Sequence, residues 1–339
     1  MPTALVTGAT GFIGGHLARH LVERGYRVRC LVRSRLRCGR LEPLGVELSI
    51  GDVTDPAGVA AAVEGMDVVF NLAGLTCALS WQQMADVNIR GPAIVAEACA
   101  HSSRPPLHIL VSSLSAAGPA PLDGCLAETD PPQPISQYGR SKLGGEHEAL
   151  RYADRVPTTI VRPGVVFGPY DPGMRPVVQS IWRWRLHLNP GSHSPRLSLI
   201  HVDDLCRVII AAAEKGERAP SSSQRPGEGI YFAVGHPQYP TYVELGQMIA
   251  TGLFDGRRTV RVIRVPTRLA WLIGWTNEGL SRVRRRPDLL NRDKIREGTA
   301  PSWVCSGEKI RQQFSFQPAA PLEQQLHEVA RWYVEAGWV

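Results

Sequence analysis

Short apolar runs alternate with amphipathic helical patterns along the first half of the chain. The runs that we interpret as strands are residues 4–7, 27–32, 46–50, 68–72, 107–112 and 158–162. Helices are predicted between them, over residues 13–24, where Ile13, Leu17 and Leu21 share one face, and over residues 89–101. Several runs are apolar throughout, which is typical of strands covered by helices on both faces of a sheet. The alternation predicts an α/β fold with a doubly wound parallel sheet of the Rossmann type.

The second half of the chain has a less regular pattern. Residues 168–195 are rich in Pro, Trp and Arg, and residues 220–229 predict a short surface loop. Residues 200–215 are interpreted as a strand end followed by a helix, and residues 230–234 as a further strand. Helices are also predicted over residues 241–253, with Thr241 as N-cap, and over residues 267–283.

The composition is that of a globular protein, with 43% hydrophobic and 20% charged residues in a chain of 339. No apolar run reaches the roughly 18 residues of a membrane span. The N-terminus lacks the basic lead and the cleavage site of a signal peptide, so we expect a cytoplasmic protein. The seven cysteines are scattered without a C-x-x-C pair, and His187, His193 and His201 have no ligand spacing. Neither a disulfide framework nor a metal site is therefore predicted.

The net charge of +7 is concentrated in two basic segments. Residues 257–296 hold twelve Lys and Arg against three acidic residues, and a shorter run contains Arg33, Arg35, Arg37 and Arg40. No nucleic-acid-binding motif accompanies these segments, so we expect no nucleic-acid partner. Within residues 266–286 apolar residues stand beside arginines, a pattern that could lie on a membrane surface. The sequence alone favours a solvated basic helix there.

A glycine-rich turn follows the first predicted strand and precedes the first predicted helix. Its pattern is G-x-x-G-x-x-G, formed by Gly8, Gly11 and Gly14. Glycines permit a tight turn and a close approach of the backbone to a pyrophosphate, and the helix N-terminus supplies unpaired N–H groups and a positive dipole end. In this context the turn predicts a dinucleotide site.

The end of the second strand indicates which dinucleotide binds. An acidic residue there would bind the 2′-hydroxyl of NAD and repel the 2′-phosphate of NADP. This chain has Arg33 and, shortly after it, Arg37, and no acidic residue before Glu42. A guanidinium binds phosphate through charge-assisted hydrogen bonds, so NADP is favoured over NAD. A solvated basic loop is the alternative interpretation.

Tyr138 and Lys142 are four residues apart at the start of a predicted helix and therefore share one face. A cation about 4 Å away, at an effective dielectric of about 20, stabilises a phenolate by on the order of 4 kcal/mol. With the help of an oxidised nicotinamide, one lysine would make the tyrosine a usable acid and base near neutral pH. Ser113 follows the fifth strand, at the carboxyl edge where ligands of doubly wound sheets bind. Together these residues predict a catalytic centre of Ser113, Tyr138 and Lys142.

These motifs resemble those of the extended short-chain dehydrogenases/reductases over nearly the whole chain. Further matches are the segments 51–55, 71–74, 162–164 and 201–205, and Asn88 in the predicted helix. The resemblance implies that Tyr138 is the general acid/base, that Lys142 binds the ribose and lowers the Tyr138 pKa, that Ser113 binds the substrate oxygen, and that Asn88 supports a proton relay through the lysine. The implied cofactor contacts are Gly8, Gly11, Phe12, Ile13, Gly14, Arg33, Arg37, Asp52, Val53, Leu72, Ala73, Gly74, Tyr138, Lys142, Pro163 and Val165. The implied substrate contacts are Ser113, Tyr138 and Thr76.

The resemblance also implies two domains and a reaction class. Residues 1–167 and 198–235 would bind the dinucleotide, and residues 168–197 and 236–339 would form a smaller substrate-binding domain. Leu114 and Ser115 stand where sugar dehydratases of the family carry an acidic pair, which argues against dehydration. Arg33, the segment 291–294 and the tail 332–338 look more like bacterial relatives of dihydroflavonol reductases and 3β-hydroxysteroid dehydrogenases. The implied reaction interconverts a carbonyl and a secondary alcohol on a bulky, largely apolar small molecule.

Two other functions stay open at this point. A nucleotide-sugar epimerase would use the same centre with a tightly held cofactor. A cofactor-sensing regulator would need only the glycine turn, so the presence of Tyr138, Lys142 and Ser113 argues against it. Relatives often form homodimers through helices that resemble residues 89–101 and 137–152, and a homodimer is the corresponding prediction here.

Overall fold

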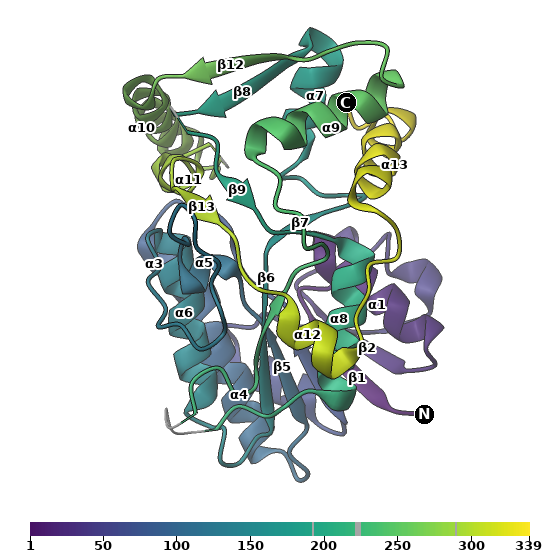
Figure 1. The fold of residues 1–339 in the computed structure, drawn as a ribbon. Coiled ribbons are helices and arrows are strands. Elements are labelled where there is room, and N and C mark those ends of the chain that lie inside the picture. Colours follow the sequence, from purple (N-terminus) through teal and green to yellow (C-terminus); the bar gives the residue numbers. More distant parts are fainter. Residues whose placement is uncertain (192, 221–224, 289) are drawn as a thin grey trace.

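Seven parallel strands form the central sheet of the computed structural model, which describes residues 1–191, 193–220, 225–288 and 290–339 (Figure 1). The strand order is β11-β6-β5-β4-β1-β2-β3. The strands are β1 (Thr3–Thr7), β2 (Arg27–Val32), β3 (Glu47–Ile50), β4 (Val68–Asn71), β5 (Leu107–Val111), β6 (Thr158–Pro163) and β11 (Ile230–Ala233). The predicted doubly wound parallel sheet is thereby confirmed, and the chain reverses its direction of strand addition between β1 and β4. In such sheets ligands bind at that point, outside the carboxyl ends of the strands.

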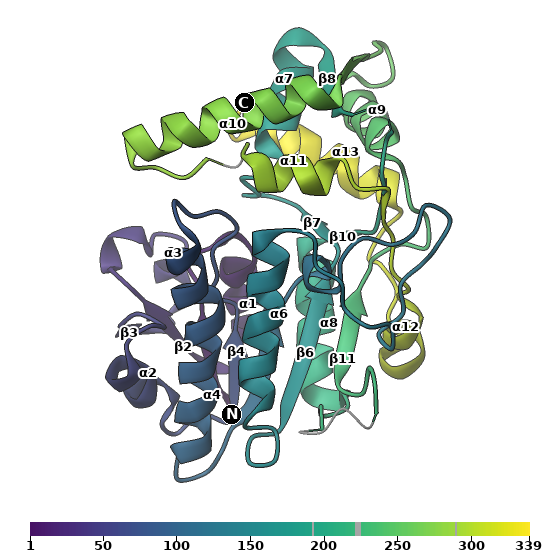
Figure 2. The ribbon, with the colours of Figure 1, turned by 90° about the vertical axis from the view of Figure 1, so that its left-hand side faces the viewer.

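Helices cover both faces of this sheet (Figure 2). One face carries α1 (Phe12–Glu23) and α8 (Val202–Lys215), with α12 (Glu308–Phe314) beside α8. The other face carries α2 (Pro56–Val63), α4 (Gly91–His101) and α6 (Gln137–Leu150). Alternate residues of β1 enter the two cores, Ala4 and Val6 on the α1 side and Leu5 on the α2 side. Burial on both faces explains why several of the strands, such as β4 and β5, are largely apolar.

Short elements complete the connections around the sheet. Two single-turn helices, η1 (Arg35–Arg37) and η2 (Glu42–Leu44), follow β2. The helix that the sequence predicted over residues 89–101 is preceded by α3 (Trp81–Ala85) and a π-helical turn, η3 (Asp86–Arg90). A short helix, α5 (Leu114–Ala117), begins directly after Ser113.

A second group of elements lies above the carboxyl edge of the sheet (Figure 1). Its helices are α7 (Arg175–Trp184), α9 (Tyr242–Phe254), α10 (Thr267–Arg284), α11 (Arg292–Gly298) and α13 (Leu322–Glu335). Three strand pairs join them: β7 (Val165–Phe167) with β10 (Leu199–His201), β8 (Leu186–Pro190) with β12 (Arg261–Val265), and β9 (Arg196–Leu197) with β13 (Ser302–Trp303). A further core, which includes Ile181, Leu245, Leu326 and Tyr333, stabilises the group and extends to α5 at Leu114.

The sequence predicted part of this second group. Helix α9 begins after Thr241, whose hydroxyl accepts from the Glu244 backbone N–H in a capping box, as expected. Residues 168–195, which we interpreted as irregular, contain α7 and β8. Strand β8 pairs with β12 from a distant part of the chain, so its local pattern carries little signal. The predicted surface loop at 220–229 includes residues 221–224, which lie outside the described residues.

Candidate functional site

The glycine turn lies between β1 and α1 and contacts the loop that follows β4. Gly8 has a φ of 69°, and a Cβ atom there would lie 2.9 Å from the backbone nitrogen of Ala73. A Cβ on Gly14 would lie 2.2 Å from the carbonyl oxygen of Gly8, so only glycine fits either position. The Thr7 hydroxyl accepts from the backbone N–H groups of Leu72 and Ala73 at 3.1 and 3.0 Å. The predicted contacts in these two loops therefore lie side by side at the carboxyl edge of the sheet.

The N-terminus of α1 fits a pyrophosphate. Its N-cap is Gly11, which has no side chain to accept from the first turn. The first four backbone N–H groups of an α-helix have no hydrogen-bond partner within the helix, and here they include those of Phe12 and Ile13. A backbone that can approach closely and amides left uncapped are what a bound phosphate requires. These residues could hold the pyrophosphate of a nicotinamide dinucleotide.

Arg33 and Arg37 are exposed just beyond the end of β2. Neither makes an ion pair within the described ranges, so both guanidinium groups are available to an anion. Arg40, which the sequence grouped with them, lies differently. Its guanidinium stacks over the ring of Tyr170 at 3.8 Å and covers Gly15 of α1. Of the four arginines in this run, Arg33, Arg35 and Arg37 are exposed, whereas Arg40 is packed against Tyr170.

Asp52 and Val53, two of the implied cofactor contacts, follow β3. One carboxylate oxygen of Asp52 accepts from the backbone N–H and the hydroxyl of Thr54, at 2.9 and 2.8 Å. Val53 is buried and packs beside Gly91 at the start of α4. The two residues are therefore fixed in position at the carboxyl edge.

Tyr138 stands in the first turn of α6, and Ser113 at the N-cap of α5 faces it. Burial raises the Tyr138 pKa, while the charge of Lys294 and the nearby Ser113 hydroxyl lower it. The Ser113 hydroxyl also accepts from the backbone N–H of Ser115 at 3.1 Å. The predicted pair of hydroxyl groups is thus brought together. The net effect on the phenol corrects our expectation, because in this structure its pKa is raised rather than lowered.

Lys142 lies one turn further along α6 and is buried. Its ammonium donates to the carbonyl oxygen of Val111, at the end of β5, at 2.8 Å. A Cβ atom on Gly74 would lie 3.7 Å from the Lys142 nitrogen, so the ammonium is close to the loop after β4. Burial lowers the Lys142 pKa to about 8, and the charge of Glu146 opposes that shift. Lys142 of α6 therefore connects the end of β5 with the loop after β4.

Asn88 holds the loop after β4 against α6. In the π-helical turn η3 its side-chain oxygen accepts from the Leu75 N–H, and its amide donates to the Leu75 carbonyl, each at 2.8 Å. The same amide donates to the Ser141 hydroxyl at 2.9 Å. Asn88 thus fixes the segment that carries Gly74 and Thr76. Thr76 is exposed and adjoins Cys77. Burial raises the pKa of the Cys77 thiol, and the Thr76 hydroxyl and the charge of Lys294 oppose that shift.

Helix α11 of the second group docks on the first turn of α6, a feature that the sequence analysis missed. The Asp293 carboxylate accepts from the backbone N–H groups of Gln137 and Tyr138, at 2.8 and 3.0 Å. The Glu297 carboxylate accepts from the Ser136 hydroxyl at 2.7 Å and from the Lys294 ammonium at 2.6 Å. That ammonium lies 5.2 Å from the centre of the Tyr138 ring. No local pattern in residues 291–294 links them to α6, so the sequence indicates this segment only through a resemblance.

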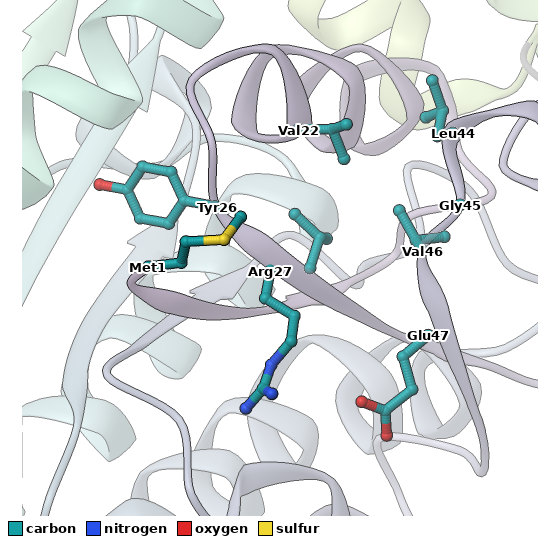
Figure 3. A pocket seen from close by; sticks show the side chains of 9 residues that line it. Met1, Val22, Tyr26, Arg27, Leu44, Gly45, Val46 and Glu47 are labelled. Atoms are coloured by element: carbon teal, nitrogen blue, oxygen red, sulfur yellow. The ribbon is translucent and has the colours of Figure 1, made fainter.

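The remaining predicted contacts lie at the end of β6. Pro163 is buried at the last position of that strand, and Val165 is exposed at the start of β7. A pocket of about 660 Å³ lies elsewhere, lined by residues that include Met1, Tyr26 and Glu47 (Figure 3). These residues stand at the amino ends of the strands, so this pocket is separate from the candidate site.

Comparison with known proteins agrees with the geometry. A sequence model of the NAD dependent epimerase/dehydratase family matches residues 4–224. The chain belongs to this family. It is an NAD(P)-dependent enzyme of the extended short-chain dehydrogenase/reductase type, as the sequence predicted.

Relatives resemble the chain over almost its whole length. A putative dihydroflavonol 4-reductase from Synechocystis sp. is 27% identical and covers 98% of this chain and 95% of its own. A 2-alkyl-3-oxoalkanoate reductase from Stenotrophomonas maltophilia is 29% identical, with 96% and 97% covered. The structure of UDP-glucuronic acid 4-epimerase from Bacillus cereus, with UDP-glucuronic acid and NAD, has a TM-score of 0.76 at 20% identity and covers 98% of this chain and 99% of its own. At that identity the structural likeness shows the fold alone.

A buried ion pair lies one turn along α6 from Lys142 and leads to a prediction about stability. Glu146 of α6 accepts from Arg162 of β6 at 2.9 and 2.6 Å, and both side chains are buried. Glu146→Gln leaves a buried guanidinium without its countercharge, so we expect the free energy of unfolding to fall by about 3 kcal/mol. Urea denaturation measures the change. Glu148→Gln, which breaks the more exposed pair with Arg151 on the same helix, should lower it by less than about 1 kcal/mol; equal losses would contradict the prediction.

Proposed function

We propose that the protein is an NADP(H)-dependent oxidoreductase that interconverts a carbonyl and a secondary alcohol, with Tyr138 as general acid/base. The observation that carries the proposal is the placement of the Tyr138 phenol beside the Ser113 hydroxyl, one helical turn from the buried Lys142, whose ammonium lies close to Gly74 in the loop after β4. A general acid must lie within hydrogen-bond reach of the oxygen that it protonates. A substrate oxygen held by Ser113 would meet that requirement.

The residues of the site have distinct roles in this proposal. Ser113 orients the substrate oxygen, and Tyr138 donates a proton to it during reduction and removes that proton during oxidation. Lys142 holds the ribose hydroxyls of the dinucleotide, and Asn88 fixes the loop that faces Lys142. Lys294 contributes a cation that stabilises the phenolate form of Tyr138. A bound nicotinamide would supply or accept the hydride.

The preference for NADP follows from the charge at the end of β2. Arg33 and Arg37 are exposed there, and no carboxylate pairs with them in the part of the chain that the structure describes. A 2′-phosphate would supply the missing countercharge, whereas a 2′-hydroxyl would leave two like charges adjacent.

The proposed substrate is a bulky, largely apolar ketone or alcohol. The full-length relatives are named as reductases, one of them of 2-alkyl-3-oxoalkanoates. Leu114 follows Ser113 and is buried in the core that joins the two groups of elements. The two residues after Ser113 are Leu114 and Ser115, so neither supplies a carboxyl group to protonate a leaving hydroxyl.

Replacing Tyr138 tests the catalytic assignment. Tyr138→Phe removes the proton donor but keeps the ring, so we expect kcat to fall by roughly 10²- to 10⁴-fold while NADP(H) affinity is retained. Steady-state NADPH oxidation with a panel of long-chain ketones measures the first quantity, and fluorescence titration measures the second. Tyr152→Phe, just beyond the other end of α6, should leave both unchanged. Full turnover in Tyr138→Phe would refute the mechanism, and turnover without net NADPH consumption would favour an epimerase.

Replacing Arg33 tests the cofactor assignment. Arg33→Ala removes a charge-assisted hydrogen bond to the 2′-phosphate, so the Kd for NADP should rise by about tenfold or more while that for NAD changes little. Isothermal titration with each dinucleotide measures the two constants. Arg27→Ala, at the other end of β2, is the matched control. Equal losses for both dinucleotides would point to NAD as the natural cofactor.

A further inference from the structure

Helix α10 has small residues on its buried face and large apolar residues on its exposed face. Ala270, Gly274 and Ser281 are buried and, at spacings of four and seven, share one side of the helix. Five large residues at helical spacing form a second side, which we name the apolar stripe: Leu269, Leu272, Ile273, Leu280 and Val283, which are 47%, 58%, 38%, 41% and 81% exposed. An ordinary surface helix has the reverse arrangement, with its large apolar side chains against the core.

Close packing against α11 fixes this orientation. A Cβ atom on Gly274 would lie 3.1 Å from the Ile295 side chain and 3.3 Å from the backbone nitrogen of Arg292. Glu278 of α10 also accepts from Arg292 at 2.5 and 2.9 Å. Figure 2 shows α10 as an outer element of the second group, with α11 beneath it. Rotation of α10 to bury the apolar stripe would break these contacts.

Unpaired positive charge borders the apolar stripe. Arg268 lies near the start of the helix and Arg284 at its end, on either side of the apolar stripe, and Arg285 and Arg286 follow. Within residues 1–191, 193–220, 225–288 and 290–339, none of these four arginines makes an ion pair. The acidic residue of the helix, Glu278, is occupied by Arg282 and Arg292. The surface therefore combines exposed apolar side chains with several uncompensated cations.

We propose that the apolar stripe of α10 docks on an anionic lipid surface. Helices that lie in a membrane interface place apolar side chains among the acyl chains and arginines at the lipid headgroups. Trp275, which is 65% exposed on α10, belongs to a residue type enriched at that depth. In the described residues no helix is long and apolar enough to cross a membrane, so α10 would lie along the surface.

The charge favours lipid over a second copy of the chain. Pairing two copies through the apolar stripe would bring their arginine clusters together, and like charges facing each other oppose association. The sequence alone favoured a solvated helix because it did not show which side of residues 266–286 faces α11. The proposal is independent of the proposed redox reaction, since lipid binding is measured without substrate or cofactor.

Vesicle co-sedimentation of the full-length protein tests the proposal. We expect the protein to bind vesicles of equal parts phosphatidylcholine and phosphatidylglycerol, to bind phosphatidylcholine vesicles at least tenfold more weakly, and to be released by salt. Leu272→Ser with Ile273→Ser, and separately Arg284→Gln with Arg286→Gln, should each weaken binding to the mixed vesicles at least tenfold. Leu122→Ser, which alters an exposed leucine far from α10 in the sequence, should not weaken it.

Three results would overturn the proposal. The first is wild-type protein that stays in solution with mixed vesicles. The second is unchanged binding by the double serine variant. The third is sedimentation in lipid-free buffer that shows a dimer which the same variant dissociates, because a second copy would then cover the apolar stripe. The circular dichroism and thermal transition of each variant show whether it is folded, and these readouts do not depend on the proposed activity.

Discussion

The docking of two carboxylates on the start of one helix determines where the candidate catalytic centre lies. Asp293 and Glu297 are carried by α11, and they accept from the backbone and the N-cap hydroxyl at the beginning of α6. The first amides of a helix have no partner within it, and the helix end is partially positive, so carboxylates are favoured there. This contact joins the second group of elements to the sheet at Tyr138. It also brings Lys294 beside the phenol, about one hundred and fifty residues away along the chain.

Burial of these groups explains the electrostatics of the site. Burial alone raises the Tyr138 pKa and lowers the Lys142 pKa, because both charged forms lose hydration. The surrounding charges oppose each shift: Lys294 stabilises the phenolate, and Glu146 stabilises the Lys142 ammonium. Arg162 in turn neutralises Glu146. Charged groups on α11, α6 and strand β6 therefore set the electrostatics around Tyr138 and Lys142.

The sequence predicted the parts of this structure that local patterns encode. Strands buried on both faces are apolar runs in the sequence, the glycine turn is recognised by the spacing of its glycines, and Tyr138 and Lys142 are four residues apart, as on adjacent turns of a helix. It did not predict the role of Lys294, because the contact with Tyr138 depends on tertiary packing of α11. The predicted direction of the Tyr138 pKa shift was also wrong, because the helical spacing pointed to Lys142 alone and could not show how much water the fold removes from the phenol. Strand β8 was missed because its partner, β12, lies far along the chain.

The pH dependence of kcat/KM for carbonyl reduction in Lys294→Met tests the central claim most directly. Reduction requires protonated Tyr138, so the rate should fall as pH rises through the pKa of the phenol. Without the Lys294 cation the phenolate is less stable, and the account predicts that this fall moves to higher pH than in the wild type. Lys309→Met is the control. Lys309 also pairs with a glutamate, Glu217, and lies over a tyrosine ring, that of Tyr231, so its removal should leave the profile unchanged. A Lys294→Met profile that superimposes on that of the wild type would contradict the account.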